Sequence, residues 1–450
     1  MDRAVYVVSD LHLGPGWLPG GALDPLEDFT ADRDFARFLA AIGTTGVPVE
    51  LVIAGDFLEY CQTLPEIGLA APEDGLGSSE AESIRRTEVI LGRNPAIASG
   101  HPEVFAALRR FMIEGNSITI IAGNHDIDLL WEGVWARIFD TIYPPGAAGD
   151  LRLVRYAYTL GNGQRGRVYI EHGHEHDRAN RFGDRMEQPF GIDRTGTRRL
   201  KRCWGTLFVD KVYNQLERER WFIDNVKPIL RVVKLGLRND LVFTATALGL
   251  VARFLLTSGL PPLLGAAAAG EGEAPDMDAV VAAIADPDLR TALEGQLADA
   301  AFRAEFERTV QAAGAAELAA AVAGAAPQLT LDEIDVVTGG EVVLGGGVGD
   351  AYRAAARAAL ENDPTLSTVV MGHTHGPLDG YSEPIDLPDG RTGYYFNSGT
   401  WTLHLKDEQH RSYSWAEIAD ERNYTASYTY VLLEPDGHGG FVPRLGSWAA

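Results

Sequence analysis

The chain has 450 residues and carries 63 Asp and Glu residues against 39 Lys and Arg residues, a formal net charge of -24. This balance disfavours a protein that binds nucleic acid through a broad basic surface, because such binding needs positive charge to neutralise phosphates. The length allows one large α/β domain with an insertion, or two domains. Only two cysteines are present, Cys61 and Cys203, and neither has a CxxC partner, so we expect a reducing, cytoplasmic location.

The first part of the chain alternates apolar runs with amphipathic segments. Strands are predicted at 5–9, 51–54 and 118–122, and amphipathic helices between them at 35–42 and 104–112. Near-continuous apolar strands separated by such helices indicate a parallel sheet that is covered on both faces. The segment 64–100 is predicted to be a long loop with a short helix at about 83–91.

Further along, a helix is predicted from about residue 128, with strand-like runs near 151–158 and 167–171. Residues 178–330 are predicted to be helical throughout, with an apolar, basic stretch at 221–260 and an acidic, Ala-rich stretch at 265–327. The apolar run 241–256 is too short for a membrane span, so a buried helix is favoured over an amphipathic surface anchor. A helix at 351–360 and strands at 367–371, 393–397, 425–433 and 441–445 then resume the sheet. The predicted domains are 1–177 and 331–450, which form one core, and the inserted segment 178–330.

Charge is unevenly distributed along the chain. Residues 178–253 contain sixteen Lys and Arg residues against eight Asp and Glu residues. Such a basic region in an acidic protein indicates either an anionic partner or a compensating internal interface.

Side chains that commonly bind metals follow five of the predicted strands. Because the carboxyl ends of parallel strands meet at one edge of a sheet, we expect these side chains to form a single site. They are Asp10 and His12, then Asp56 with Glu59 nearby, then Asn124, His125 and Asp126, then His172, His174 and His176, and finally His373 and His375.

This set mixes oxygen and nitrogen ligands and lacks thiolates, which suits divalent Mn, Fe, Zn or Co. A carboxylate such as Asp56 can bridge two metals, and two adjacent metals can share an activated water while binding the oxygens of an in-line displacement. The chemistry that this arrangement suits is hydrolysis at phosphorus.

The motifs DLH, GDxxE, GNHD, HGH and GHTH, in this order and each after a strand, resemble those of the calcineurin-like metallophosphoesterase superfamily. The resemblance covers about residues 4–177 and 365–403, and it implies an αββα sandwich with two metals at the strand ends, here with a large, mostly helical insertion. It implies that one metal is held by Asp10, His12 and His375, the other by Asn124, His172 and His373, with Asp56 as the bridge.

The same resemblance implies that His125 contacts the scissile phosphate or protonates the leaving group, with Asp126 orienting it. Histidine suits an acid role because its pKa lies near neutral pH. Glu59 has two interpretations: it orients a metal ligand, or it caps the turn that follows.

Within the superfamily, DLHLG, GDFLE, HGHEHD and NSGTW resemble the UDP-2,3-diacylglucosamine pyrophosphatase group, which cleaves a nucleotide-lipid pyrophosphate at the membrane surface. Members of that group typically have Arg where this chain has His125, and they lack a helical insertion of this size. The substrate therefore stays open among phosphomonoesters, phosphodiesters and pyrophosphates, including nucleotide- and lipid-linked ones.

Three further residues are candidates for substrate contacts: His174, Arg178 and Arg181. His174 either binds substrate or is solvated, and the same two interpretations apply to His176. The two arginines can bind an anionic group of the substrate. The insertion has two interpretations. One is a cap that recognises a lipid-like or nucleotide-linked phosphoester, with peripheral contact at the inner membrane face; the other is a helical interface of a homo-oligomer.

The sequence thus predicts a dinuclear phosphoester hydrolase, with Mn as the first choice of metal and an anionic phosphoester as its substrate. One alternative is a nuclease or phosphodiesterase that acts on nucleic acid or a cyclic nucleotide, although no aromatic and basic strip for stacking bases is evident. The other is a non-catalytic scaffold of the same fold. A scaffold would usually lack ligands, and none is missing here.

Overall fold

The computed structural model describes residues 3–44, 46–67, 76–163, 165–177, 179–223, 348–406 and 413–449, with isolated positions between 225 and 304. It is a mixed α/β structure. Its strands form a six-stranded sheet, a five-stranded sheet and two small two-stranded sheets.

The six-stranded sheet contains the first four strands of the chain and the last two. Its order is β15-β14-β1-β2-β3-β4, and the strands β1 to β4 pair in parallel. Every residue of β2 and β3 is buried, as expected for strands that are covered on both faces. The strands are β1 (Val5–Val8), β2 (Glu50–Ala54), β3 (Ser117–Ile121), β4 (Leu151–Val154), β14 (Thr429–Pro435) and β15 (Phe441–Ser447).

The five-stranded sheet has the order β10-β11-β9-β6-β5. Its strands β6 and β9 are neighbours and pair in parallel. Because β6 ends at Glu171 and β9 begins at Leu366, the chain leaves this sheet after β6 and returns to it at β9. The run predicted as one strand at 151–158 is in fact divided between β4 and β5, which belong to different sheets. The strands are β5 (Ala157–Leu160), β6 (Arg167–Glu171), β9 (Leu366–Met371), β10 (Ile385–Asp386) and β11 (Thr392–Asn397).

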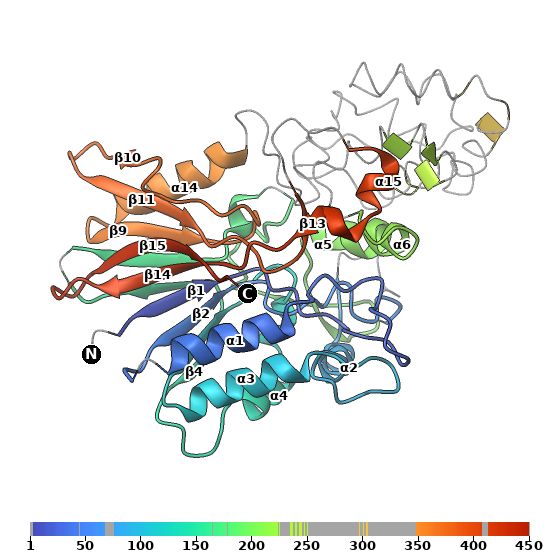
Figure 1. Ribbon diagram of the computed structural model, residues 1–450, viewed down its shortest axis with the longest axis horizontal. Helices are drawn as coiled ribbons and strands as arrows, with labels where there is room; N and C mark the ends of the chain where they lie inside the picture. Colours follow the sequence, from blue (N-terminus) through green and yellow to red (C-terminus); the bar gives the residue numbers. More distant parts are fainter. Residues whose placement is uncertain are drawn as a thin grey trace.

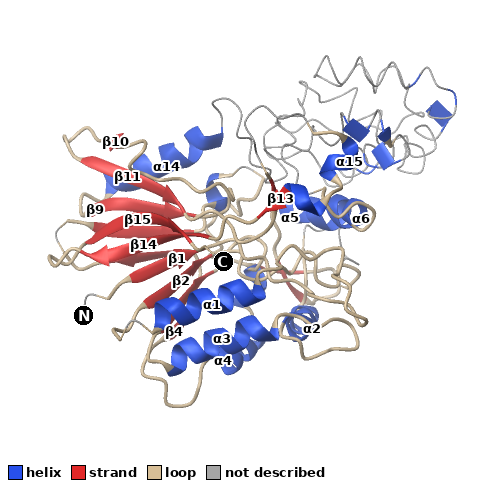
Figure 2. Ribbon diagram, in the orientation of Figure 1, coloured by secondary structure: helices blue, strands red, loops and turns tan. Residues whose placement is uncertain are grey.

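The two sheets pack face to face, and helices cover their outer faces (Figures 1 and 2). Between the sheets lies an apolar layer that includes Val7, Val52, Ile170 and Val370. A second layer joins the six-stranded sheet to α1 (Asp32–Gly43), α3 (Pro102–Ile113) and α4 (Glu132–Ile142), and a third joins the five-stranded sheet to α14 (Val348–Asn362). Helix α2 (Glu80–Ile90) corresponds to the short helix predicted at 83–91.

The beginning of the predicted helical insertion contains a β-hairpin, so the expectation of helix throughout 178–330 is wrong there. Strands β7 (Phe190–Ile192) and β8 (Arg198–Leu200) pair in antiparallel fashion. The turn between them forms because the carboxylate of Asp193 accepts the backbone N–H groups of Thr195 and Thr197, a local bonding pattern that competes with helix. The predictions for 221–260 and 265–327 lie largely outside the described residues.

After the hairpin, the chain forms α5 (Trp204–Phe208), a π-helical turn (Val209–Tyr213) and α6 (Asn214–Glu217). Their apolar side chains pack against a C-terminal segment that contains β12 (His404–Leu405), α15 (Trp415–Ile418) and β13 (Tyr424–Thr425). Figure 1 shows α5, α6 and α15 together beyond the ends of β1 and β2. In the part of the chain that the structure describes, no helix is both long enough and apolar enough to cross a membrane.

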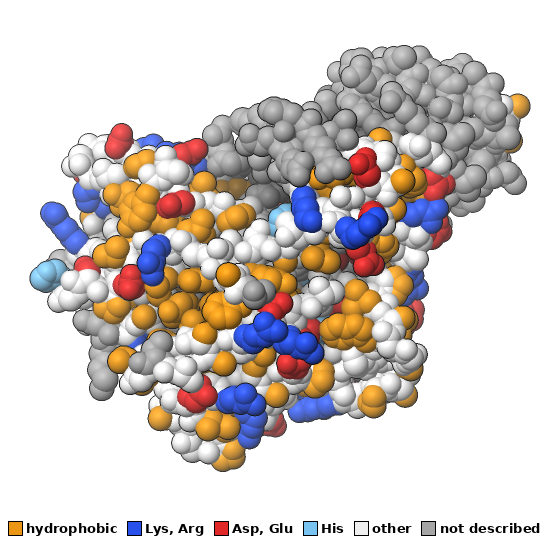
Figure 3. Space-filling view, in the orientation of Figure 1, with side chains coloured by type: hydrophobic (Ala, Val, Ile, Leu, Met, Phe, Trp, Pro, Cys, Tyr) orange, Lys and Arg blue, Asp and Glu red, His pale blue; other side chains and the backbone are white. Residues whose placement is uncertain are grey.

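Several arginines of the basic region are paired inside the protein. Arg199 contacts Asp193 and Glu82, and Arg202 contacts Asp210. On the face shown in Figure 3, Lys and Arg side chains lie among Asp and Glu side chains over the described residues. Each of these pairs neutralises a cation within the fold, and of the three acidic partners only Glu82 lies outside the basic region.

Candidate metal centre

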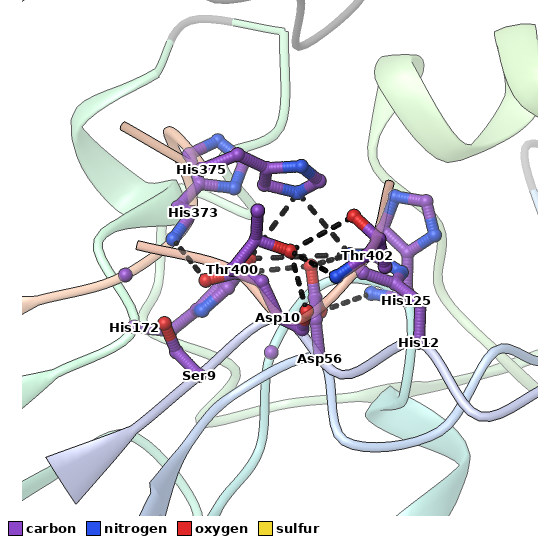
Figure 4. A network of polar contacts seen from close by, with 12 residues as sticks. Ser9, Asp10, His12, Asp56, His125, His172, His373, His375, Thr400 and Thr402 are labelled. Carbon is purple, nitrogen blue, oxygen red and sulfur yellow. Dashed lines mark hydrogen bonds and ion pairs between the residues drawn. The ribbon is translucent and has the colours of Figure 1, made fainter. Parts of the chain in front are cut away.

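Side chains from five strand ends converge at the carboxyl edge of the two sheets (Figure 4). They follow β1, β2 and β3 of one sheet and β6 and β9 of the other. Among the described residues, three groups of His and carboxylate side chains have ligand atoms close enough to share a metal ion. These groups are Asp10, His12 and His375; then Asp56, His172 and His373; then His12, Glu59 and His125.

In the first group, the two imidazoles face the Oδ1 atom of Asp10. The Nε2 atom of His375 lies 3.5 Å from this oxygen, and the Nε2 atom of His12 lies 3.9 Å from it. The two Nε2 atoms are 3.3 Å apart. Two imidazoles and one carboxylate thus face a common point, as a metal site requires.

In the second group, oxygen atoms face the Nε2 atom of His172. The Oδ2 atom of Asp56 lies 3.0 Å from this nitrogen, and the Oδ1 atom of Asn124 lies 3.1 Å from it. The same Oδ2 atom of Asp56 lies 3.8 Å from Nε2 of His12 in the first group. Asp56 therefore stands between the two groups, where a bridging carboxylate is expected.

Two observations show that these residues fit bound cations. The Oδ1 atom of Asp10 is buried and has no hydrogen-bond partner in the described structure, an arrangement that a cation would satisfy. In addition, five of the expected ligands adopt positive φ angles, which cost free energy for residues with a side chain and concentrate at functional sites. These are Asp10 (52°), His12 (49°), Asp56 (48°), His373 (70°) and His375 (61°).

Glu59 makes the contacts that both of its interpretations require. Its Oε2 atom accepts hydrogen bonds from Nδ1 of His12 at 2.9 Å and from Nδ1 of His125 at 2.6 Å. Its Oε1 atom accepts the backbone N–H groups of Cys61 and Gln62, which caps the turn after β2. The proximity of Glu59 to these two imidazoles is therefore explained by hydrogen bonding, and one carboxylate orients both rings.

Backbone and carboxylate oxygens orient two further imidazoles. Nδ1 of His172 donates to the carbonyl oxygen of Ala54 at 2.9 Å, which leaves Nε2 facing Asp56. Nε2 of His373 donates to Oδ2 of Asp177 at 3.2 Å. Partners of this kind select the tautomer and hold the ring direction of metal-binding histidines.

Asp126 does not hold the ring of His125, in contrast to the expectation from the sequence. Its carboxylate instead accepts the backbone N–H groups of Gly123 at 2.6 Å and of Phe57 at 2.8 Å, and so joins the turns after β2 and β3. The orienting role expected of Asp126 belongs to Glu59. The resemblance implied Asp126, whereas in the structure the carboxylate of Asp126 faces backbone N–H groups.

The site is strongly polarised. Burial alone would raise the pKa of Asp56, but the neighbouring His172 and His125 hold it well below its ordinary value. Burial likewise opposes ionisation of Glu59, yet its two histidine partners lower its pKa to about 2. Burial lowers the pKa of His125, but the charges of Glu59 and Asp56 raise it well above its ordinary value. The carboxylates of Asp56 and Glu59 are thus ionised, and His125 carries a proton at neutral pH.

Glycines before the ligands allow the strand ends to approach one another. Gly55 has a φ of +91°, and a Cβ atom there would overlap the ring of His172. A Cβ atom at Gly123 would overlap the carboxylate of Asp56. The GD and GNH motifs therefore combine a ligand with the only residue type that leaves room for the facing ligand.

The remaining candidates have different environments. His174 is fully buried, so the solvated interpretation does not hold and no surface is offered to a substrate; neither of its ring nitrogens has a hydrogen-bond partner in the described structure. Burial and the charge of His172 lower the pKa of His174 well below its ordinary value.

Nε2 of His176 donates to Glu171 at 2.6 Å. Arg181 is exposed, and Arg178 lies outside the described residues.

Sequence reasoning missed Asp177 and Asn180, which contact the expected ligands His373 and Asn124. The available signal was the D-x-x-N pattern directly after the histidine run, because a short polar turn next to a metal motif often supplies partners for the ligands.

Comparison with known proteins adds no family assignment. The sequence matches no protein-family model, and no curated protein matches it. Functional inference therefore depends on the residues and their geometry.

Proposed function

We propose that the chain is a dinuclear metal-dependent phosphoesterase. The observation that carries this proposal is the position of Asp56, whose Oδ2 atom lies 3.0 Å from Nε2 of His172 and 3.8 Å from Nε2 of His12. One carboxylate oxygen is thereby shared between two groups that each contain imidazole and oxygen donors. Oxygen and nitrogen donors without thiolate favour Mn²⁺, with Fe, Zn and Co as further candidates.

When bound, two such metals would supply Lewis acidity toward a phosphoryl oxygen and lower the pKa of bound water. Asp10, His12 and His375 would hold one metal, Asn124, His172 and His373 the other, and Asp56 both.

His125 supplies the proton that phosphoester cleavage requires at the leaving group. Its side chain is 17% exposed, whereas that of Glu59 beneath it is 2% exposed, so the imidazole borders the solvent side of the site. Glu59 accepts the Nδ1–H group of His125 and directs Nε2 away from the carboxylate. The raised pKa keeps the ring protonated in the neutral range, the state from which it can donate to a departing oxygen.

The arrangement of the sheets supports this assignment. Two packed sheets with helices on both outer faces correspond to the αββα sandwich that the resemblance implies, and the ligands lie at the strand ends where that family places its metals.

The substrate class is the less specific part of the proposal. We infer an anionic phosphoester or pyrophosphate, because the exposed Arg181 lies four residues after Asp177, which contacts the expected ligand His373. A nucleotide or lipid linkage is what the resemblance to the pyrophosphatase group implies. Cytoplasmic location, contact with the inner membrane face and homo-oligomer formation stay predictions. The nuclease alternative is weakened by the net charge of -24, and the scaffold alternative by the complete ligand set.

Hydrolysis assays test the proposed function. Metal-stripped protein resupplied with Mn²⁺ is given p-nitrophenyl phosphate, bis-p-nitrophenyl phosphate and a UDP-sugar lipid, in parallel with Asp56→Asn. We expect Mn-dependent turnover of at least one compound and its loss in the variant, because the neutral amide cannot serve as a charged bridge. Turnover that survives Asp56→Asn would refute the assignment.

A further inference from the structure

A chain of hydrogen bonds connects two expected ligands of one metal through Asp177 and Asn180, which lie on either side of the boundary between segments 1–177 and 178–330. Oδ2 of Asp177 accepts from Nε2 of His373 at 3.2 Å and from Nδ2 of Asn180 at 2.6 Å. Oδ1 of Asn180 accepts from Nδ2 of Asn124 at 3.3 Å. The order is therefore Asn124, Asn180, Asp177, His373, with Asn180 in contact with both sides.

The direction of every bond in this chain is determined by chemistry. A carboxylate can only accept, so Asn180 must direct its NH₂ group toward Asp177 and its oxygen toward Asn124. Asn124 must then direct its own NH₂ group toward Asn180. Its oxygen is left facing the metal position, 3.1 Å from Nε2 of His172. Reversal of the Asn124 amide would present NH₂ there, which cannot bind a metal.

Water competes little with these bonds, because the four residues are nearly inaccessible. Relative exposures are 2% for Asn124, 3% for Asn180, 8% for Asp177 and 6% for His373. A buried polar network that is fully satisfied restricts its members to one arrangement.

The start of the insertion holds Asn180 in place. The backbone N–H group of Asn180 donates to the carbonyl of Asp177, and the thiol of Cys203 lies 3.7 Å from Oδ1 of Asn180. A Cβ atom at Gly205 would overlap the Asn180 side chain. The amide is thus enclosed by the turn after residue 177 and by the beginning of α5.

We propose that Asn180 is a positioning residue that fixes Asn124 directly and His373 through Asp177. The two ligands follow strands of different sheets, β3 and β9, so a single amide at the beginning of the insertion aligns the two halves of one metal position. The other group, Asp10, His12 and His375, makes no hydrogen bond to Asn180 in the described structure. This inference rests on the proposed function, because it requires two bound metals.

Metal affinity tests the inference independently of turnover. Mn²⁺ binding to metal-stripped full-length protein is measured by calorimetry, and electron paramagnetic resonance distinguishes paired Mn²⁺ ions from isolated ones. For Asn180→Ala we expect one site to weaken by roughly ten- to a hundredfold, the effect typical of lost partners of metal ligands, while the other site keeps its affinity. The paired signal should then give way to the isolated one at sub-saturating Mn²⁺.

Two further variants keep the test decisive. Asn180→Asp preserves side-chain size but places a second carboxylate beside Asp177, so it should weaken the same site even if Asn180→Ala folds poorly. Asn116→Ala is the matched control. Asn116 is also a buried amide with three hydrogen bonds to backbone groups, but it lies at the opposite end of β3 from the site. It should lower the melting temperature without selective metal loss.

The outcomes separate the inference from the function that it assumes. If the wild type binds two Mn²⁺ ions and both Asn180 variants bind them equally well, the positioning role is refuted and the dinuclear proposal stands. Equal weakening of both sites in the Asn180 variants would also refute it. If the wild type itself binds fewer than two ions, the proposed function fails first.

Discussion

A buried histidine clamp, formed by His101, Glu27 and Asp32, should make the stability of this protein depend on pH in the alkaline range. His101, at the start of α3, donates from Nδ1 to Asp32 and from Nε2 to Glu27, each at 3.0 Å. Glu27 also accepts the backbone N–H group of Gly16 at 2.6 Å, so the clamp fastens the loop that follows the expected ligand His12.

The size of the effect follows from the charge on His101. Burial alone would lower its pKa, but the charge of Glu27 and the hydrogen bonds to Glu27 and Asp32 raise it from 6.5 to about 9. A pKa unit corresponds to about 1.4 kcal/mol, so protonation of this residue contributes roughly 3 kcal/mol to folding. Because the folded-state pKa is the raised one, this contribution is complete below pH 6.5 and is lost as the pH rises through about 9.

Urea unfolding of the metal-free protein between pH 6 and pH 10 measures this loss. We expect the free energy of unfolding to fall over that range by roughly 3 kcal/mol from His101 alone, and by more in total, because the pKa values of His172 and His125 are also raised in the folded protein. In His101→Gln the absolute stability should be lower, because Glu27 and Asp32 lose their cation, and the alkaline decline should be smaller than that of the wild type by roughly 3 kcal/mol. An identical decline in wild type and variant would show that another group titrates, and would refute the reasoning.

Two further substitutions test how the centre is held. Glu59→Gln should lower Mn-dependent kcat by roughly ten- to a hundredfold, because the amide cannot accept from two imidazole N–H groups with a charged oxygen; unchanged kcat and Mn²⁺ affinity would contradict the shared orienting role. Gly55→Ala should lower the melting temperature far more than Gly115→Ala. Both glycines have φ near +90°, but only at Gly55 does the added methyl group overlap His172, whereas nothing lies within 4 Å at Gly115. Equal shifts in melting temperature would show that the crowding at His172 is not limiting.

Much of the sheet, and the convergence of the expected ligands at one edge of it, could be predicted because the relevant signals are local. Short apolar runs such as 51–54 and 118–122 are typical of central parallel strands that are buried on both faces, and β2 and β3 occupy these positions. A ligand that directly follows such a strand is placed at the sheet edge by chain connectivity alone. Asp56 and His172 therefore meet although they are far apart in the sequence.

What could not be predicted depends on turns and on distant partners. The hairpin at β7 and β8 forms through the carboxylate of Asp193, a bond that periodicity does not reveal. Glu59 reaches His125 because β2 and β3 are neighbours, whereas the adjacent Asp126 is used by the backbone. Asn180 contacts Asp177, Asn124 and Cys203, and the D-x-x-N pattern signals only the first of these contacts, because the other two partners are distant in the sequence.

The most direct test of the dinuclear centre is the Mn²⁺ stoichiometry of metal-stripped protein after reconstitution, measured by elemental analysis together with electron paramagnetic resonance. The arrangement around Asp56 predicts two ions per chain with a spin-coupled signal, and loss of the coupled signal in Asp56→Asn. A single uncoupled ion in the wild type, or a coupled pair that persists in Asp56→Asn, would contradict the claim that this carboxylate joins two metal positions.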